Sequence, residues 1–241
     1  MSRPVLRTPL CDLLGIEYPV ILAGMGPSGT ATRGIARAEL VAAVSNAGGL
    51  GVIGGAGMSP EELRQEIRKV RDLTDKPFGV DLLLPALGQI PPATSGGSAP
   101  ASWRELVPGE VREFVLQIKR RFELPDVGQE AMPRFAPDHI RRQMEVVLEE
   151  RVPVFASGLG DPAPFVPDLH RNGTRVIALV GNVKNARRVA EGGADIVVAQ
   201  GYEAGGHTGR VGTMALVPQV VDAVAPRPVV AAGGIGDGRG L

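Results

Sequence analysis

The sequence predicts an α/β fold, a parallel sheet covered by helices, on the basis of three observations. Short runs rich in Val, Ile and Ala alternate with amphipathic helical segments along the 241 residues. The runs are apolar at successive positions, as strands are when both faces of a parallel sheet are covered. Nearly every run ends in glycine or another small residue. A doubly wound open sheet and a TIM (β/α)8-type barrel both fit this alternation, and the small strand ends favour the barrel, whose active site gathers there.

Seven successive β/α units are expected. A TIM barrel has eight strands, whereas this chain reaches Leu241 just inside its seventh helix. A sheet of seven strands leaves two unpaired edges, which natural sheets avoid. We therefore expect a barrel that is truncated after its seventh strand. The expected strands span residues 19–25, 50–55, 78–84, 152–158, 174–181, 195–201 and 228–234.

The helix at 60–73 carries the clearest start signals. Ser59 can act as the N-cap, Pro60 suits the first helical position, and acidic residues in the first turn complement the positive end of the helix. The other helices are expected at 34–48, 109–123, 138–150, 162–172, 184–193 and 216–224.

Residues 85–137 interrupt the alternation after the third strand. The segment opens with Pro/Gly/Ser-rich sequence, which predicts an irregular loop, before the helix at 109–123. Long insertions after a barrel strand usually lie over the active-site mouth. A substrate lid and a surface decoration both remain open. We expect 1–241 to form a single domain that carries this insertion.

Charge and composition exclude several classes of protein. Lys and Arg (26) balance Asp and Glu (26), so the charge indicates neither nucleic acid nor an anionic membrane as partner. Cys11 is the only cysteine, which excludes intramolecular disulfides and cysteine-cluster metal sites, and we expect no metal. The N-terminus lacks the apolar core of a signal peptide, and no run reaches membrane-spanning length. We therefore expect a soluble, cytoplasmic protein.

Residues 195–213 form the strongest candidate for an active-site loop. An apolar strand stops at Gln200 and Gly201, and a glycine-rich loop with Gly205, Gly206 and His207 follows. Glycine lets the backbone approach a flat or anionic ligand, and histidine, with its near-neutral pKa, suits proton transfer. The other two histidines, His139 and His170, lie on or beside charged helices and are expected to be structural.

Three further strand ends carry candidate ligand-binding residues. Gly233 and Gly234 open a GGIGDG segment after the last expected strand, where backbone N–H groups can bind an anion, although the glycines alone could form only a tight turn. Gly24 and Met25 end the first strand, and Asp81 lies in the third. Each taken singly could be a packing residue.

Several of these segments together resemble one enzyme family. The string GADIVVAQGYEAGGHTGRVGTMALVPQVVDAV, with ELVAAVSNAGGLGVIGG, PFGVDLLLP and VFASGLGDP elsewhere, is similar to the FMN-dependent nitronate monooxygenases, formerly called 2-nitropropane dioxygenases. The related FMN-dependent enoyl-acyl carrier protein reductases share the EAGGHxG loop. The insertion after Pro85 favours the nitronate monooxygenases.

The resemblance implies a role for each candidate residue. Gly24 and Met25 lie against the flavin ring, Gln200 and Gly201 contact the cofactor, and Gly205 and Gly206 let the loop wrap it. Gly233 and Gly234 hold the FMN phosphate. His207 abstracts the Cα proton of a nitroalkane or holds the nitronate oxygens, and reaction with O2 then yields a carbonyl compound and nitrite. A homodimer is also possible.

Two departures from the family pattern leave alternatives open. Asp81 stands where the family often has asparagine, and a carboxylate beside a reduced flavin would disfavour the anionic flavin. A second phosphate-binding segment, GTRF-like and following strand 8 in the family, is absent from this sequence. The first alternative is an enoyl-thioester reductase that uses NAD(P)H. The second is a truncated, non-catalytic flavin-binding or scaffold protein.

Overall fold

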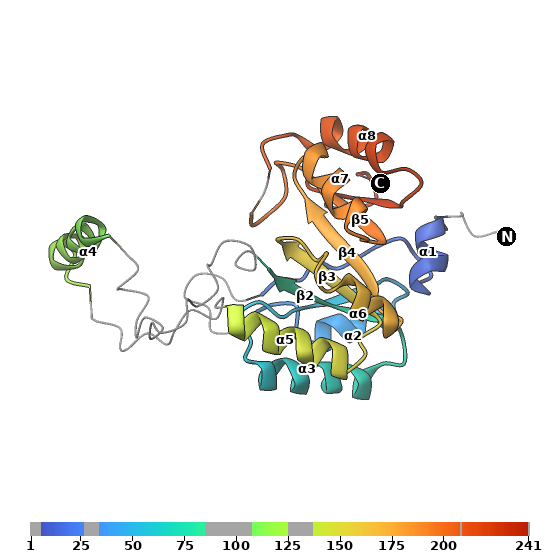
Figure 1. Cartoon of the computed structure of the whole chain (residues 1–241), viewed down its shortest axis with the longest axis horizontal. Helices are drawn as coiled ribbons and strands as arrows, with labels where there is room; N and C mark the ends of the chain where they lie inside the picture. The colour runs from blue at the N-terminus through green and yellow to red at the C-terminus, as the bar shows by residue number, and fades with distance from the viewer. Residues whose placement is uncertain (1–5, 27–33, 85–107, 125–136, 208, 241) are drawn as a thin grey trace.

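A single parallel sheet organises the protein (Figure 1). The computed structural model describes residues 6–26, 34–84, 108–124, 137–207 and 209–240. Within these residues six strands pair in sequence order, every neighbour parallel. A doubly wound sheet reverses its strand order at a switch point, so the consecutive order identifies a half-barrel. The strands are β1 (Gly51–Gly54), β2 (Phe78–Leu83), β3 (Val154–Leu159), β4 (Arg175–Val180), β5 (Ile196–Gln200) and β6 (Val229–Ala232).

The strand expected at 19–25 is wrong, because only one parallel bridge, Ile21 to Leu50, forms there. Beyond this bridge Met25 stays packed against Gly54 of β1, but its backbone hydrogen bonds go elsewhere. Its N–H bonds the carbonyl of Ala23, and its own carbonyl accepts from the N–H groups of Ile35 and Ala36. A ladder with β1 would need those same groups, so the segment runs beside the sheet without extending it.

In the described residues, seven helices pack against the sheet or its ends. Most of them lie within a few residues of the ranges expected from the sequence. The helix expected at 60–73 is confirmed with a full capping box, since Ser59 and Glu62 exchange hydrogen bonds between side chain and backbone. α2 begins later than expected, at Ala38, whose N–H donates to the side chain of Glu66 at 2.6 Å. These helices are α1 (Pro9–Leu14), α2 (Ala38–Asn46), α3 (Pro60–Leu73), α5 (Pro137–Glu149), α6 (Val166–Arg171), α7 (Val183–Glu191) and α8 (Thr213–Val224).

The two faces of the sheet have separate cores. Successive strand residues alternate between them: Val52 and Val198 face one cluster, whereas Ile53 and Val197 face the other. The larger cluster fills the space between the sheet and helices α2, α3, α5, α7 and α8. The smaller cluster includes Leu10, Cys11 and Leu14 of α1, a helix that the sequence did not predict. α1 packs at the amino-terminal ends of the strands, where its Leu13 lies near Ala194 and Pro228 (Figure 1).

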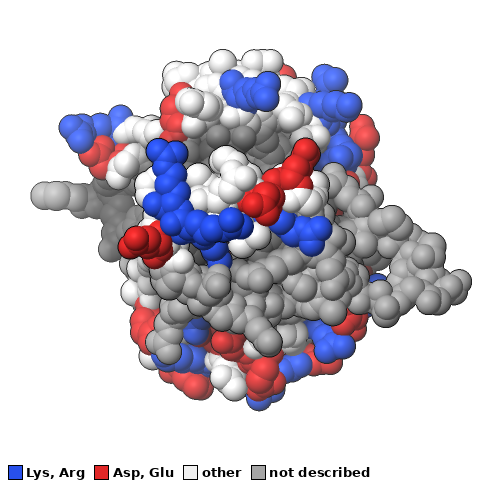
Figure 2. Space-filling view, turned by 90° about the vertical axis from the view of Figure 1, so that its left-hand side faces the viewer, with Lys and Arg blue, Asp and Glu red and all other residues white. Residues whose placement is uncertain are grey.

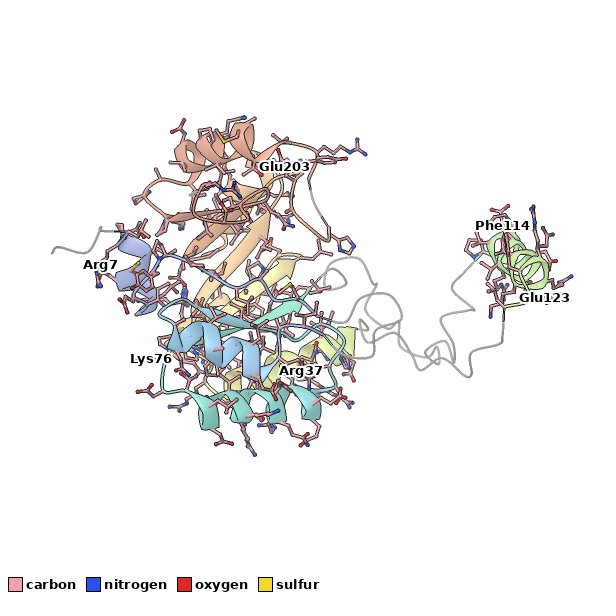
Figure 3. The ribbon with its side chains drawn as sticks, turned by 180° about the vertical axis from the view of Figure 1, so that it is seen from behind. Arg7, Arg37, Lys76, Phe114, Glu123 and Glu203 are labelled. Carbon is pink, nitrogen blue, oxygen red and sulfur yellow. The ribbon has the colours of Figure 1, made fainter. Side chains whose placement is uncertain are left out.

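The inserted segment is described only in part. Its helix, expected at 109–123, is α4 (Gly109–Arg121), and residues 85–107 and 125–136 lie outside the described residues. α4 stands apart from the sheet, and none of its residues is buried (Figure 1). Phe114, labelled in Figure 3, is 61% exposed. No helix in the described part of the chain is long and apolar enough to cross a membrane.

Candidate active site

The carboxyl ends of the six parallel strands meet at one edge of the sheet, and the candidate residues lie there. The strands point to the left in Figure 1, and Figure 2 views the molecule from that side. Basic and acidic side chains both occur on the visible part of this face, around an uncharged area. The candidate residues form two groups, one around Asp81 and one around the loop after β5.

Asp81 is buried between two glycines. A Cβ atom at Gly24 would lie 2.4 Å from the Cβ of Asp81, and a Cβ at Gly158 would lie 2.8 Å from its Oδ1. Only glycine fits at either position without displacing the acid. The side chain is 8% exposed, and its Oδ1 has no hydrogen-bond partner within the described structure.

Burial raises the pKa of Asp81 to about 8, and the backbone N–H of Gly158 opposes the shift. The acid is therefore neutral at pH 7. Below about pH 8 the Asp81 carboxyl therefore carries no negative charge that would oppose an anionic flavin, contrary to the expectation from sequence. A neutral carboxyl can donate a hydrogen bond, which a carboxylate cannot.

The side chain of Gln200 holds the loop that carries Gly205 and His207 at the end of β5. Its side-chain Nε2 donates to the carbonyl oxygens of Gly205, at 3.1 Å, and of His207, at 3.2 Å. These two bonds use both N–H groups of the amide. The part of Gln200 left for a ligand is therefore the amide oxygen. His207 itself is exposed.

Glu203 is a structural residue of this loop that sequence reasoning missed. Its Oε2 accepts from the backbone N–H of Thr213, at 2.8 Å, and from the Thr213 hydroxyl, at 2.9 Å. It caps α8, because the N-cap residue Gly212 has no side chain to do so. The N–H of Thr213 lowers the pKa of Glu203. Figure 3 shows Glu203 beside α8. Because ten residues separate Glu203 from Thr213, no local capping pattern reveals this contact.

The glycines of this region divide into crowded and open positions. A Cβ at Gly201 would lie 2.1 Å from the hydroxyl oxygen of Thr213, and one at Gly209 would lie 2.4 Å from the carbonyl oxygen of Gly181. These two glycines are needed by the packing of the protein itself. At Gly205 and Gly206 a Cβ would meet nothing within 4 Å. The two glycines that the resemblance assigns to wrapping the cofactor are thus the ones with free space.

Gly233 and Gly234 follow β6 with φ values of 114° and 75°. Side chains other than glycine rarely adopt these values. A Cβ at Gly233 would also lie 2.7 Å from the Thr213 hydroxyl. The turn therefore needs both glycines for its own geometry, and it brings their backbone beside the start of α8. Anion binding at this turn stays a prediction.

The remaining histidines are structural, as expected. His139 shares a hydrogen bond of 2.9 Å with the carbonyl of Met58, and His170 bonds Asp195 at 2.9 Å. His170 and Asp195 line a shallow hollow with Leu13 and Arg227, away from the carboxyl ends of the strands. No group of three or more His, Cys, Asp or Glu in the described residues is placed to hold a metal ion.

The residues present fit a flat, polar cofactor such as a flavin. The partnerless Oδ1 of Asp81 supplies a buried polar atom for a ligand atom to satisfy. Met25, 38% exposed, follows Gly24 at the same edge of the sheet. Gly205 and Gly206 leave space beside the loop of His207. The structure thus brings together Gly24 and Asp81 in one group, and Gln200, Gly205 and His207 in another.

Comparisons with known proteins point the same way. The family model described as nitronate monooxygenase matches residues 7–241. The chain is 40% identical to a Mycobacterium tuberculosis protein named "Putative monooxygenase Rv1533", covering 97% of this chain and 61% of that protein. It is 37% identical to the (3aS,4S,5R,7aS)-5-hydroxy-7a-methyl-1-oxo-octahydro-1H-indene-4-carboxyl-CoA dehydrogenase of the same organism, covering 98% of this chain and 51% of that enzyme.

Two solved structures share the fold. FabK from Thermotoga maritima, in its M276A mutant form, aligns with a TM-score of 0.70 and 36% identity, covering 98% of this chain and 59% of that one. Nitroalkane oxidase from Streptomyces ansochromogenes aligns with a TM-score of 0.69 and 31% identity, covering 95% of this chain and 61% of that one. This chain therefore spans 51–61% of the length of these four proteins.

Proposed function

Since this chain belongs to the nitronate monooxygenase family, we propose that it is an FMN-dependent oxidoreductase that oxidises alkyl nitronates. The reaction consumes O2 and yields a carbonyl compound and nitrite. The 31% identity to a nitroalkane oxidase over 95% of this chain supports this substrate class. In this proposal one domain, 1–241, binds the cofactor, residues 85–137 act as a lid, and the chain works in the cytoplasm, as a homodimer.

The observation that carries the proposal is the partnerless Oδ1 atom of Asp81, between Gly24 and Gly158. A buried polar atom without a partner costs stability, about 1–3 kcal/mol, unless a ligand satisfies it. Gly24 and Gly158 lie directly against this side chain, since a Cβ atom at either position would overlap it. Bound FMN would supply the redox chemistry, which no side chain of this group offers.

His207 is the residue that we propose to act on the substrate. As a neutral imidazole it takes the acidic Cα proton of a nitroalkane, and as an imidazolium it holds the nitronate oxygens. The bond from Gln200 to the His207 carbonyl limits the movement of this part of the loop. Gly233 and Gly234 are proposed to bind the phosphate of FMN through their backbone N–H groups.

A second candidate function is the reduction of an enoyl thioester with NAD(P)H. It is supported by 36% identity to FabK, an enoyl reductase, and by 37% identity to a carboxyl-CoA dehydrogenase. The two functions differ in their co-substrates. A chain without either activity would fit a scaffold or flavin-binding role.

Oxygen consumption and NAD(P)H oxidation distinguish these functions. The purified chain is reconstituted with FMN and given propyl-2-nitronate, without NAD(P)H, in an oxygen electrode. Consumption of O2 with formation of nitrite supports the proposal. NAD(P)H oxidation that depends on crotonyl-CoA, with no response to nitronate, supports the second candidate. No flavin absorbance and no turnover from a protein with a folded circular dichroism spectrum would refute both enzymatic functions.

A further inference from the structure

Asp81 differs from the other buried acids of the described structure. Glu66 is paired with Arg37 and also accepts from the N–H of Ala38. Glu150 is held by Arg64, Arg68 and Arg71. Asp81 alone has a buried side-chain oxygen without any hydrogen-bond partner among the described residues. Within the described ranges, arginines pair with Glu66 and Glu150, and no cation pairs with Asp81.

The surroundings of Asp81 explain why it holds a proton. Directly after β1, Gly55 contacts Asp81, and its N–H donates to the Asp81 carbonyl oxygen at 2.9 Å. From the segment before α2 Asp81 is met by Gly24, and from β3 by Ala156, its register partner, and by Gly158. None of these residues is ionisable. Desolvation and the N–H of Gly158 are the two causes acting on its pKa.

The position of this proton matters for binding. Asp81 lies in the carboxyl-terminal half of β2, beside Gly54, the last residue of β1, and so near the edge at which parallel α/β sheets bind ligands. Gly24 and Gly158 pack against its two sides, and 8% of the residue stays exposed. A neutral carboxyl can donate to a lone pair of a ligand atom, whereas an ionised one would set a buried negative charge against that lone pair.

We propose that Asp81 stays protonated in the working protein and donates this proton, as a hydrogen bond, to an acceptor atom of the bound cofactor. This inference rests on the proposed FMN function and specifies the chemistry of the same site. It makes Asp81 a residue that recognises the cofactor by its acceptor atoms. Cofactor binding then depends on whether the Asp81 side chain carries its proton.

The proposal fixes the sign of the pH dependence. At pH 6–7 Asp81 is protonated with and without cofactor, so the dissociation constant of FMN does not depend on its titration. Above about pH 8 the free protein loses the proton, and binding must recover it. The dissociation constant then rises by about tenfold for each further pH unit. An asparagine at this position donates through an amide that does not titrate, so the variant lacks the rise.

The test is titration of the apoprotein with FMN between pH 6 and 9.5, read by quenching of flavin fluorescence. Wild type, Asp81→Asn and Asp222→Asn are compared, the last being the same substitution at an exposed site on α8. Ionisation of FMN itself acts equally on all three proteins. We expect the FMN affinity of wild type and of Asp222→Asn to fall at least tenfold between pH 7 and 9.5. The FMN affinity of Asp81→Asn should fall less than threefold over the same range. Circular dichroism at each pH verifies that all three stay folded.

A second readout needs no cofactor. The carbonyl stretch of a protonated carboxylic acid in the infrared spectrum of the apoprotein should be present at pH 7, should disappear above about pH 8, and should be absent from Asp81→Asn. Identical pH profiles for wild type and Asp81→Asn, or tighter wild-type binding as pH rises, would overturn the inference alone. Failure of all three proteins to bind FMN at pH 6 would overturn the proposed function together with it.

Discussion

The side-chain amide of Gln200 donates a hydrogen bond of 3.2 Å to the carbonyl oxygen of His207. The last residue of β5 thus holds the loop that carries the candidate catalytic histidine. A second bond, to the carbonyl oxygen of Gly205 at 3.1 Å, holds the same loop two residues earlier. The family resemblance predicts that Gln200 contacts the cofactor, and the tertiary structure adds a positioning role.

Replacing Gln200 with leucine should loosen the loop. Both donated bonds are lost, so kcat/KM for a nitronate should fall by about tenfold, equivalent to ~1.4 kcal/mol. Amide hydrogen exchange in residues 204–207 should become faster. Gln219→Leu is the matched control, because Gln219 only bonds the carbonyl of Ala215 on an exposed face of α8. Unchanged exchange in the Gln200 variant would show that the bonds do not hold the loop.

Removing the acceptor at Glu203 should expose the start of α8. Glu203→Leu leaves the N–H of Thr213 without its cap, so exchange of that amide should accelerate and nitronate turnover should fall. Glu203→Gln keeps an oxygen acceptor and should retain most of the protection. Equal protection in the Leu and Gln variants would contradict capping by this side chain.

Gly24→Ala should be among the most damaging single-methyl additions in this chain. The new Cβ would lie 2.4 Å from the Cβ of Asp81, and relief of that overlap should cost about 1–3 kcal/mol of unfolding free energy in urea titrations. FMN affinity should fall as well. Gly109→Ala, at the exposed start of α4, is the control and should be neutral or stabilising. Asp81→Gly in the Gly24→Ala background should restore stability, and failure to do so would place the strain elsewhere.

The apoprotein should lose stability as the pH rises, through Asp81. Its pKa in the folded state is about 8, above the value near 4 in the unfolded chain, so the folded state binds this proton more tightly. The stabilising contribution is complete below about pH 4 and is lost as the pH rises towards 8, at up to about 1.4 kcal/mol per pH unit. Urea unfolding of wild type and Asp81→Asn should show this difference between pH 5 and 8. A constant difference would contradict the raised pKa.

His207→Asn should lower nitronate turnover by about a hundredfold or more, the usual contribution of a general acid–base group. FMN affinity and urea stability should change little, because the His207 side chain is exposed. His170→Asn, which breaks a bond to Asp195 away from the site, is the control and should turn over at the wild-type rate. Full turnover by the His207 variant would remove this residue from the mechanism.

Local patterns in the sequence were sufficient for most of the secondary structure. The helix at 60–73 is confirmed at both ends, because its capping box and apolar spacing are encoded within the segment itself. The strands from β1 to β6 fall within a few residues of their expected positions. α1 was missed, since it is six residues long and Thr8, its N-cap, makes no side-chain capping bond. The strand at 19–25 failed because the backbone groups of Met25 bond residues 35 and 36, which no local pattern reveals.

The candidate site was predictable in its location but not in its chemistry. By itself the sequence determined the α/β alternation, the strand ends at which the candidate residues lie, and the glycine loop of His207. These features depend on composition and on periods of two and 3.6 residues, which are local. Only the tertiary structure decided that Asp81 is neutral, that Glu203 caps α8, and which glycines are crowded. Burial and contact between residues far apart in the chain depend on how the whole sheet curves, and no short stretch of sequence carries that information.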